Sequence, residues 1–257
     1  FYDSTATLTG AINISHKGMT GYGIFDRTGS RTVSPKFMFE QTSFTARDAE
    51  FEILSDVEGK PAVKSDFVKV FFQLDSGYAE FGPEKEGFAA NEFPYLKYKT
   101  SINNGLWDFD KHTVTMSMPE GGNILNSYFY STHPDQDSLV FNAKKAVYLM
   151  DSLSLYVTGV PEIIVADGKI IPDRGELFIK ENALLDTLRN AIIVMDTVNE
   201  FHHLYDGTIH IVSRSKFTGN AKYSYVNLLG DSLYINFNSF DLVETKISKK
   251  KTEVHTV

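Results

Sequence analysis

The sequence predicts an all-β fold, either a β-solenoid or an elongated, jelly-roll-like stack of β-sheets with degenerate repeats. Three observations predict it: many short stretches alternate apolar and polar residues, aromatic residues are abundant, and one strand-like motif occurs twice. The chain has 257 residues with 20 Phe and 13 Tyr, and aromatic and β-branched residues favour pleated, half-buried surfaces. A pair of β-sandwiches is the alternative arrangement.

The repeated motif is aromatic-x-Ala-x-x-Ala-x-aromatic. Residues 44–51 read Phe-Thr-Ala-Arg-Asp-Ala-Glu-Phe, and residues 141–148 read Phe-Asn-Ala-Lys-Lys-Ala-Val-Tyr. A single short strand pair cannot bury its apolar face, whereas stacked copies share one core. We therefore expect the alanines where one layer crosses close to the next, and the aromatic residues inside as ladders. Coincidence among alternating strands is the competing interpretation.

A second echo links the two ends of the chain. Gly10-Ala-Ile-Asn-Ile14, followed by Thr20-Gly21, resembles Gly207-Thr-Ile-His-Ile211, followed by Thr218-Gly219. The offset between the two copies is one residue larger for the second part than for the first. We therefore expect the C-terminal copy to carry one additional residue in the turn. Two echoes with different offsets indicate degenerate structural repeats rather than duplication of a whole domain.

The N-terminal part predicts a series of strands. Residues 5–15 place small or apolar residues at even positions, which is typical of a strand with one buried face. Gly18, Gly21 and Gly23 follow; without a Cβ they permit positive φ or close approach of a neighbouring strand. Their order does not match a dinucleotide-binding fingerprint, and no helical pattern follows. Further turns are expected at residues 27–30, 57–61 and 75–77.

The middle of the chain is less regular. Residues 78–98 predict short strands and a looping crossover, whereas 106–110 and 113–118 predict a hairpin around the turn 110–112. We treat residues 1–257 as a single elongated β-repeat region, with a soft boundary near 131–138. Because the chain opens on Phe1 without a signal peptide, we expect it to be processed or part of a longer chain.

From residue 139 the expected strands become short and dense. Residues 181–200 are ambiguous, since Leu184, Leu188 and Ala191 have helical spacing. However, 167–171, 189–193 and 206–210 look like neighbouring copies of one strand pattern. This favours a turn at 189–190 and a strand at 191–195, although a helix stays open. The basic residues 246–251 are expected to be a solvated end.

Composition excludes several classes of protein. The chain is 42% hydrophobic and 23% charged, as in globular proteins, and its net charge of −8 argues against a broad nucleic-acid face. It contains no cysteine, which excludes disulfides, thiolate zinc sites and cysteine nucleophiles. No apolar run approaches the roughly 18 residues that a transmembrane helix needs.

The best metal-like cluster is His202-His203 with Glu200 and Asp206. Adjacent residues of a strand point to opposite faces, so the two histidines are poorly placed to share an ion. A His-Glu-x-x-His motif is absent. We therefore predict no metal site and no cofactor. The other histidines are scattered singly: His16, His112, His133, His210 and His255.

Two carboxylate pairs, Asp108 with Asp110 and Glu50 with Glu52, have the spacing that shares one face of a strand. Such pairs are the chemistry of glycosidases, but they are expected by chance among 33 acidic residues. The serine-hydrolase pattern Gly-x-Ser-x-Gly is absent. We identify no catalytic residue and leave the binding residues unassigned. The aromatic residues that could stack on sugar rings, or serve in the core, are Trp107, Tyr95 and Tyr98.

One stretch resembles a known repeat. Residues 139–148, Leu-Val-Phe-x-Ala-x-x-Ala-x-Tyr, continue into 153–159, Leu-x-Leu-Tyr-x-x-Gly, and 163–167, Ile-Ile-Val-Ala-Asp. Together they resemble the OstA-like repeat of lipopolysaccharide-transport proteins, which implies an open β-jelly-roll or solenoid conduit for lipid. The whole chain resembles large secreted or envelope β-repeat proteins of Bacteroidetes-type bacteria. This similarity is strongest over residues 160–226, especially 167–175, Asp-Gly-Lys-Ile-Ile-Pro-Asp-Arg-Gly.

We therefore expect a non-enzymatic structural or interaction protein of the bacterial envelope, in the periplasm, at the outer-membrane surface or secreted. It would be a subunit of an outer-membrane-associated complex or a lipid conduit. The alternative is a carbohydrate-active β-helix enzyme, either a polysaccharide lyase or a glycoside hydrolase. The expected partners are other envelope proteins, and lipid or polysaccharide are the candidate ligands. We expect no binding of nucleic acid and no transmembrane segment. A scaffold predicts an apolar interior and exposed strand edges; an enzyme predicts a carboxylate-lined groove.

Overall fold

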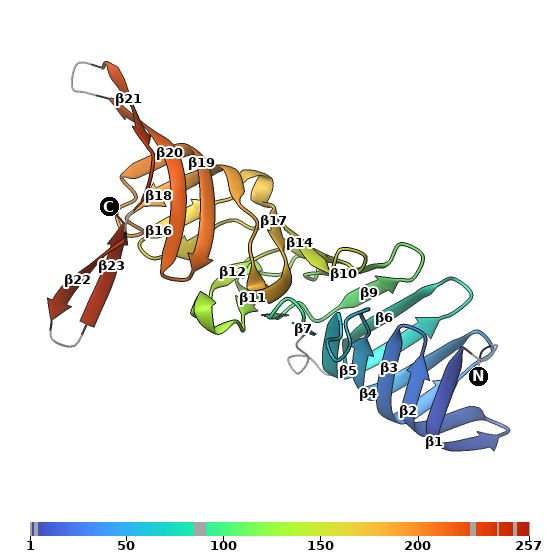
Figure 1. The fold of residues 1–257 in the computed structure, drawn as a ribbon. Coiled ribbons are helices and arrows are strands. Elements are labelled where there is room, and N and C mark those ends of the chain that lie inside the picture. Colours follow the sequence, from blue (N-terminus) through green and yellow to red (C-terminus); the bar gives the residue numbers. More distant parts are fainter. Residues whose placement is uncertain are drawn as a thin grey trace.

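The computed structural model describes residues 2, 5–84, 91–226, 230–240, 242–248 and 251–256, without the side chains of 242–256. These residues form an elongated all-β molecule (Figure 1). Antiparallel pairing joins 21 strands into one sheet, and β22 (Leu242–Ser248) and β23 (Lys251–Thr256) form a separate hairpin. The predicted elongated stack of β-sheets is thus confirmed. In the basic segment 246–251, residues 249 and 250 lie outside the described residues.

The large sheet divides into two facing layers at β5 (Val63–Gln73). The first residues of β5 pair with β7, whereas its last six pair with β6. The first layer contains β6 (Tyr78–Pro83), β9 (Gly105–Asp108), β10 (Thr113–Ser117), β13 (Lys145–Leu149), β14 (Ser154–Thr158) and β17 (Leu177–Ile179). The second layer contains β7 (Asn91–Phe93), β8 (Tyr98–Thr100), β11 (Tyr128–Ser131), β12 (Val140–Asn142), β15 (Ile163–Val165) and β16 (Gly168–Ile171).

The chain adds hairpins to the two layers alternately. Hairpin β9–β10 joins the first layer, β11–β12 the second, β13–β14 the first and β15–β16 the second. Each new hairpin pairs with the previous one in its own layer, β10 with β13 and β12 with β15. The crossings between layers therefore run along one edge of the molecule, and the hairpin turns run along the other, which we call the turn edge. Four short 3-10 turns lie in these connections: η1 (Ile124–Asn126), η2 (Pro134–Gln136), η3 (Asp173–Gly175) and η4 (Glu181–Ala183).

Long strands complete the molecule at both ends. The N-terminal strands are β1 (Ala6–Ser15), β2 (Gly18–Arg27), β3 (Ser30–Phe39) and β4 (Ser43–Ile53). The C-terminal strands are β18 (Leu188–Met195), β19 (His202–Ser213), β20 (Lys216–Val226) and β21 (Ser232–Phe237). Two of these strands and β5 bend at a bulge that carries a residue with positive φ: Asp48 in β4, Asp206 in β19 and Phe67 in β5, at 46°, 51° and 58°. A bulge bends its strand, so one strand serves both layers.

The ambiguous span 181–200 contains a strand. After η4, β18 runs from Leu188 to Met195, with a positive φ of 54° at Asn190. β18 pairs with β16 on one side and with β19 on the other. The three similar segments therefore lie on neighbouring strands, as the sequence pattern indicates, and the strand interpretation is confirmed. The turn expected at 189–190 is wrong, because both residues lie within β18, where the pairing with β19 is bulged.

The twin aromatic-alanine motifs mark the places where the chain changes layer. In β4, Phe44 and Ala46 lie beside the part of β5 that pairs with β6, and Ala49 and Phe51 follow the bulge towards the second layer. In the second copy, the motif begins on β12 of the second layer and ends on β13 of the first. All eight defining residues are buried: Phe44, Ala46, Ala49, Phe51, Phe141, Ala143, Ala146 and Tyr148. The prediction that this motif is a packing unit is confirmed.

The second echo also has a structural counterpart. Ile12 lies opposite Gly21 in hairpin β1–β2, and Ile209 lies opposite Gly219 in hairpin β19–β20. Nearer the turn, Ile14 faces Met19 and Ile211 faces Phe217. Both hairpins close with two-residue turns, between Ser15 and Gly18 and between Ser213 and Lys216, so the inserted residue is not in the turn as predicted but forms a bulge of β19 between Ile211 and Ser213. Similarly built hairpins thus lie near both ends of the molecule, with β21 added beyond the C-terminal one.

Gly23 shows why glycine is needed at these hairpins. Its φ is 129°, and a Cβ added there would lie 2.2 Å from the carbonyl oxygen of Thr9 on β1. L side chains are strained at that φ, and the backbone of β1 blocks the space. The prediction that these glycines permit positive φ or close approach is therefore confirmed.

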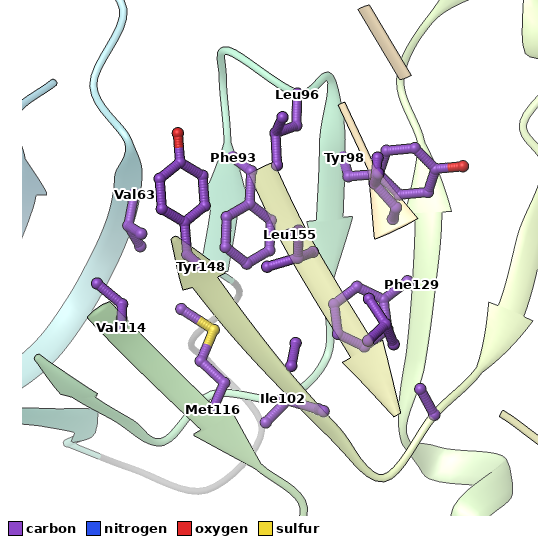
Figure 2. Packing of buried hydrophobic residues seen from close by; sticks show 14 of the residues in the cluster. Val63, Phe93, Leu96, Tyr98, Ile102, Val114, Met116, Phe129, Tyr148 and Leu155 are labelled. Atoms are coloured by element: carbon purple, nitrogen blue, oxygen red, sulfur yellow. The ribbon is translucent and has the colours of Figure 1, made fainter. Parts of the chain in front are cut away.

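Aromatic ladders fill the space between the layers. At the N-terminal end, Phe44 packs on Phe25 and Phe72, with ring centroids 4.6 and 4.4 Å apart. In the middle, Phe93 of the second layer stacks on Tyr148 of the first at 5.9 Å (Figure 2). Both rings are fully buried. The expected ladders and apolar interior are confirmed.

One prediction about β1 is wrong. The even positions of residues 5–15 were expected to form a buried face, but only Ala6 is buried, and Ile12 and Ile14 are 44% and 77% exposed. An inner side chain is buried only where facing strands cover it. As the outermost strand, β1 lacks that cover towards its hairpin tip.

Candidate functional site

The outer edge of β1 is the most unusual surface of the molecule. β1 pairs with β2, and no strand in the described ranges pairs with the other side of residues 7–15. The strand reads Ala-Thr-Leu-Thr-Gly-Ala-Ile-Asn-Ile-Ser, without a charged residue or proline. Natural edge strands are usually protected from strand addition by charges, prolines or bulges. The edge of β1 has neither a charged residue nor a proline to block strand addition, and it is therefore a candidate docking site.

The hairpin geometry shows which backbone groups of β1 face outward. Ser15 and Gly18 close a two-residue turn and form a hydrogen-bonded pair, after which such pairs alternate along an antiparallel ladder. The N–H and C=O groups of Leu8, Gly10, Ile12 and Ile14 therefore point away from β2. These groups can accept a further antiparallel strand.

The opposite end has a comparable edge. β21 reads Ser-Leu-Tyr-Ile-Asn-Phe, has no charged residue and is exposed along its whole length. Among the described strands it pairs only with β20. Figure 1 places β1 and β21 at opposite ends of the elongated molecule. The lack of charge in both strands is visible in the sequence, but their position at the two ends is not.

A shallow groove runs over the outer face of the first layer, across β5, β6, β9 and β10. Two adjoining hollows of about 560 and 370 Å³ share Glu80 and Leu106. Gly82 and Asn104 line one side, and the carboxylates Asp108 and Asp110 lie on the other. The groove therefore contains the carboxylate pair that the sequence singles out.

Asp108 does not have the environment of a general acid. Asp108 accepts hydrogen bonds from the backbone N–H of Lys111 at 3.0 Å and from its Nζ at 2.6 Å. Those hydrogen bonds lower the pKa of Asp108, whereas a general acid of a glycosidase needs a raised pKa. The other carboxylate pair, Glu50 with Glu52, lies on β4, where Glu52 forms an ion pair with Lys64 at 3.2 Å.

The three candidate sugar-stacking residues do not line this groove with open ring faces. Trp107 is 5% exposed and Tyr98 is fully buried, so both belong to the core. Tyr98 donates a hydrogen bond to Gln136 at 3.0 Å. Tyr95 is partly exposed, and the Lys60 ammonium lies 5.6 Å from its ring centroid. Of the two uses that the sequence left open, the core role holds for Trp107 and Tyr98.

The histidine cluster is dispersed. His202 and His203 open β19, so their side chains point to opposite faces. His202 Nδ1 lies 3.0 Å from the hydroxyl of Tyr223, and His203 Nε2 lies 3.0 Å from the Glu200 carbonyl oxygen. Asp206 pairs with Lys222 at 3.1 Å. Among the described residues, no group of three or more His, Asp or Glu is arranged to hold a metal ion.

The chain matches no family model, and neither the curated proteins nor the solved structures contain a significant match. Within the described part of the chain, no helix has the length and apolar character required to cross a bilayer.

Proposed function

We propose that this chain is a non-enzymatic structural protein of the bacterial envelope whose copies join end to end. In this arrangement β1 of one copy adds to the free edge of β21 in the next. The observation that carries the proposal is the exposed, uncharged edge of β1 at one end and of β21 at the other. Backbone hydrogen bonds across such an edge give affinity without a side-chain pocket.

The likeness of the two ends supports joining between copies. Hairpins β1–β2 and β19–β20 share an isoleucine-glycine cross-strand pair, so the hairpins near the two ends are built alike. A contact between two different surfaces of identical chains is heterologous, and it produces rings or open filaments. Continuing the two-layer sheet in this way would produce a filament.

The filled interior favours a scaffold over a lipid conduit. Large side chains such as Phe72, Phe93 and Tyr148 are fully buried between the layers. A conduit would need that space to be open to acyl chains. We therefore retain the scaffold form of the expected function.

The envelope location rests on the resemblance of residues 160–226 to envelope β-repeat proteins. Fractionation of the cells that make the protein tests it directly. Recovery with the periplasm, the outer membrane or the culture medium would support the location, and recovery with the cytoplasm would contradict it.

Replacing Ile12 with proline is expected to weaken association of the chain by roughly tenfold or more. Proline removes an outward N–H of β1 but none of the hydrogen bonds to β2, so the hairpin should persist. Sedimentation over a range of concentrations measures the effect. Wild type should gain mass as concentration rises, whereas Ile12→Pro should stay largely monomeric.

Ile164→Lys is the matched control. Ile164 is also an exposed isoleucine, at 43%, but β15 lies inside the sheet between β12 and β16. This variant should associate as wild type does. A wild type that stays monomeric throughout, or an Ile12→Pro variant that associates equally well, would contradict the proposal.

A further inference from the structure

A cavity opens at the turn edge, between the N-terminal strands and the first layer. Its volume is about 480 Å³, within the usual range for small-molecule sites. The turns β2–β3 and β4–β5 form one side, and the turns β9–β10 and β13–β14 form the other. Apolar groups of Leu54, Trp107, Phe109 and Met150 form much of its wall. We call it the mouth cavity.

The mouth cavity contains a cation without a counterion. The Arg27 guanidinium lies 4.4 Å from the ring centroid of Phe109 and 5.9 Å from that of Phe72. It donates one hydrogen bond, from Nη1 to the Thr28 carbonyl at 3.3 Å. Its Nε is buried and has no acceptor. No carboxylate in the described ranges forms an ion pair with it, although Arg31 pairs with Asp26 at 3.7 Å and Arg47 with Glu84 at 3.4 Å.

Burial makes this arrangement costly for the free protein. Arg27 is partly buried, and desolvation lowers its pKa, but a guanidinium stays protonated at neutral pH. Partial removal of a charge from water is unfavourable without a partner, and the faces of Phe109 and Phe72 supply only a weak one. An anion brought into the cavity would form charge-assisted hydrogen bonds with the free donors of Arg27.

The rim limits what kind of anion fits. Asp56 and Asp151 both line the cavity, and His112 Nδ1 lies 2.8 Å from Asp151 Oδ1. These carboxylates would repel a ligand with several negative charges. One inner cation, apolar walls and an acidic rim together suit a ligand with a single anionic group on an apolar body.

We propose that the mouth cavity binds a monoanionic amphiphile, a carboxylate on a short alkyl chain, with its carboxylate on Arg27. The chain would lie against Leu54 and Met150 at the entrance. It runs outward because Phe72, fully buried next to Arg27, closes the way into the core, and the cavity volume of about 480 Å³ limits its length. This site does not depend on assembly of copies through β1.

Trp107 provides the probe, because it is the only tryptophan of the chain and lines the cavity. We would titrate the wild-type protein with decanoate below its micelle concentration and record tryptophan emission. A saturable change is expected. Decanol, which has the same chain without the charge, should bind roughly tenfold or more weakly. Arg27→Gln should lose decanoate affinity by a similar factor but keep its affinity for decanol.

Arg31→Gln is the matched control, because Arg31 lies near Arg27 but is paired with Asp26 on the surface. It should bind decanoate as wild type does. Equal affinities of wild type for decanoate and decanol would overturn the proposal, and this comparison needs no variant. An unchanged affinity of Arg27→Gln for decanoate, or no saturable emission change, would also overturn it.

Discussion

Replacing Phe44 with alanine is expected to lower the free energy of unfolding by about 3–5 kcal/mol. Phe44 is 1% exposed and lies at the centre of the N-terminal aromatic ladder, in contact with Phe25 and Phe72. Truncation removes the burial of its ring and leaves a cavity that bent, bulged strands cannot readily close. Urea or guanidinium unfolding followed by circular dichroism measures the change.

Phe201→Ala serves as the control for Phe44→Ala. Phe201 is 76% exposed and precedes β19, so its truncation should change stability by no more than about 0.5 kcal/mol. Equal effects of the two substitutions would mean that the ladder at Phe44 does not stabilise the two-layer arrangement.

Replacing Ala146 with leucine is expected to destabilise the protein by about 1–3 kcal/mol. Ala146 is 1% exposed and is the second alanine of the motif at residues 141–148, just after the chain crosses from β12 to β13. It lies between Met116 and Val157 on the neighbouring strands. The added atoms would have to displace the facing layer or the flanking side chains. Thermal unfolding of the variant and the wild type measures the effect.

The neighbouring substitution Val147→Leu separates overpacking from a general intolerance of β13. Val147 is only partly buried, and its side chain points to the outer face. It should be nearly neutral. An Ala146→Leu variant as stable as Val147→Leu would show that the alanines do not mark a close approach of the layers.

Local patterns were enough to predict the strands and the packing motifs. Alternation with a period of two is set by neighbouring residues, so hairpin β9–β10 and the dense strands after residue 139 could be placed without tertiary information. The span 181–200 shows the limit of this reasoning. Leu184 and Leu188 have helical spacing, yet pairing of β18 with β16 and β19 decides in favour of a strand.

The alternation of hairpins between layers could not be predicted. Pairing of β10 with β13 skips a whole hairpin, and nothing in the local sequence specifies such a partner. Exposure depends on the same long-range arrangement. A tryptophan ring can stack on a sugar, but the ring of Trp107 is buried. Phe72 and Phe109 pack against it, with ring centroids 6.3 and 4.5 Å away.

The candidate sites were missed for the same reason. The absence of charge along β1 was available as a signal, but a buried central strand has the same composition. The mouth cavity unites four turns that are distant in sequence. Its one local signal is that Arg27 continues the inward alternation of Phe25 on β2, which places a cation at an apolar position.

An engineered disulfide tests end-to-end joining most directly. The chain has no cysteine, so any bond formed comes from introduced residues. With Ile12→Cys on β1 and Ile235→Cys on β21 in one chain, mild oxidation should produce a ladder of cross-linked oligomers. Neither single variant should produce it. If the double variant forms no ladder, β1 does not join β21 of another copy and the account is contradicted. The same holds if Ile12→Cys alone cross-links to the same extent, because β1 would then join β1 of another copy.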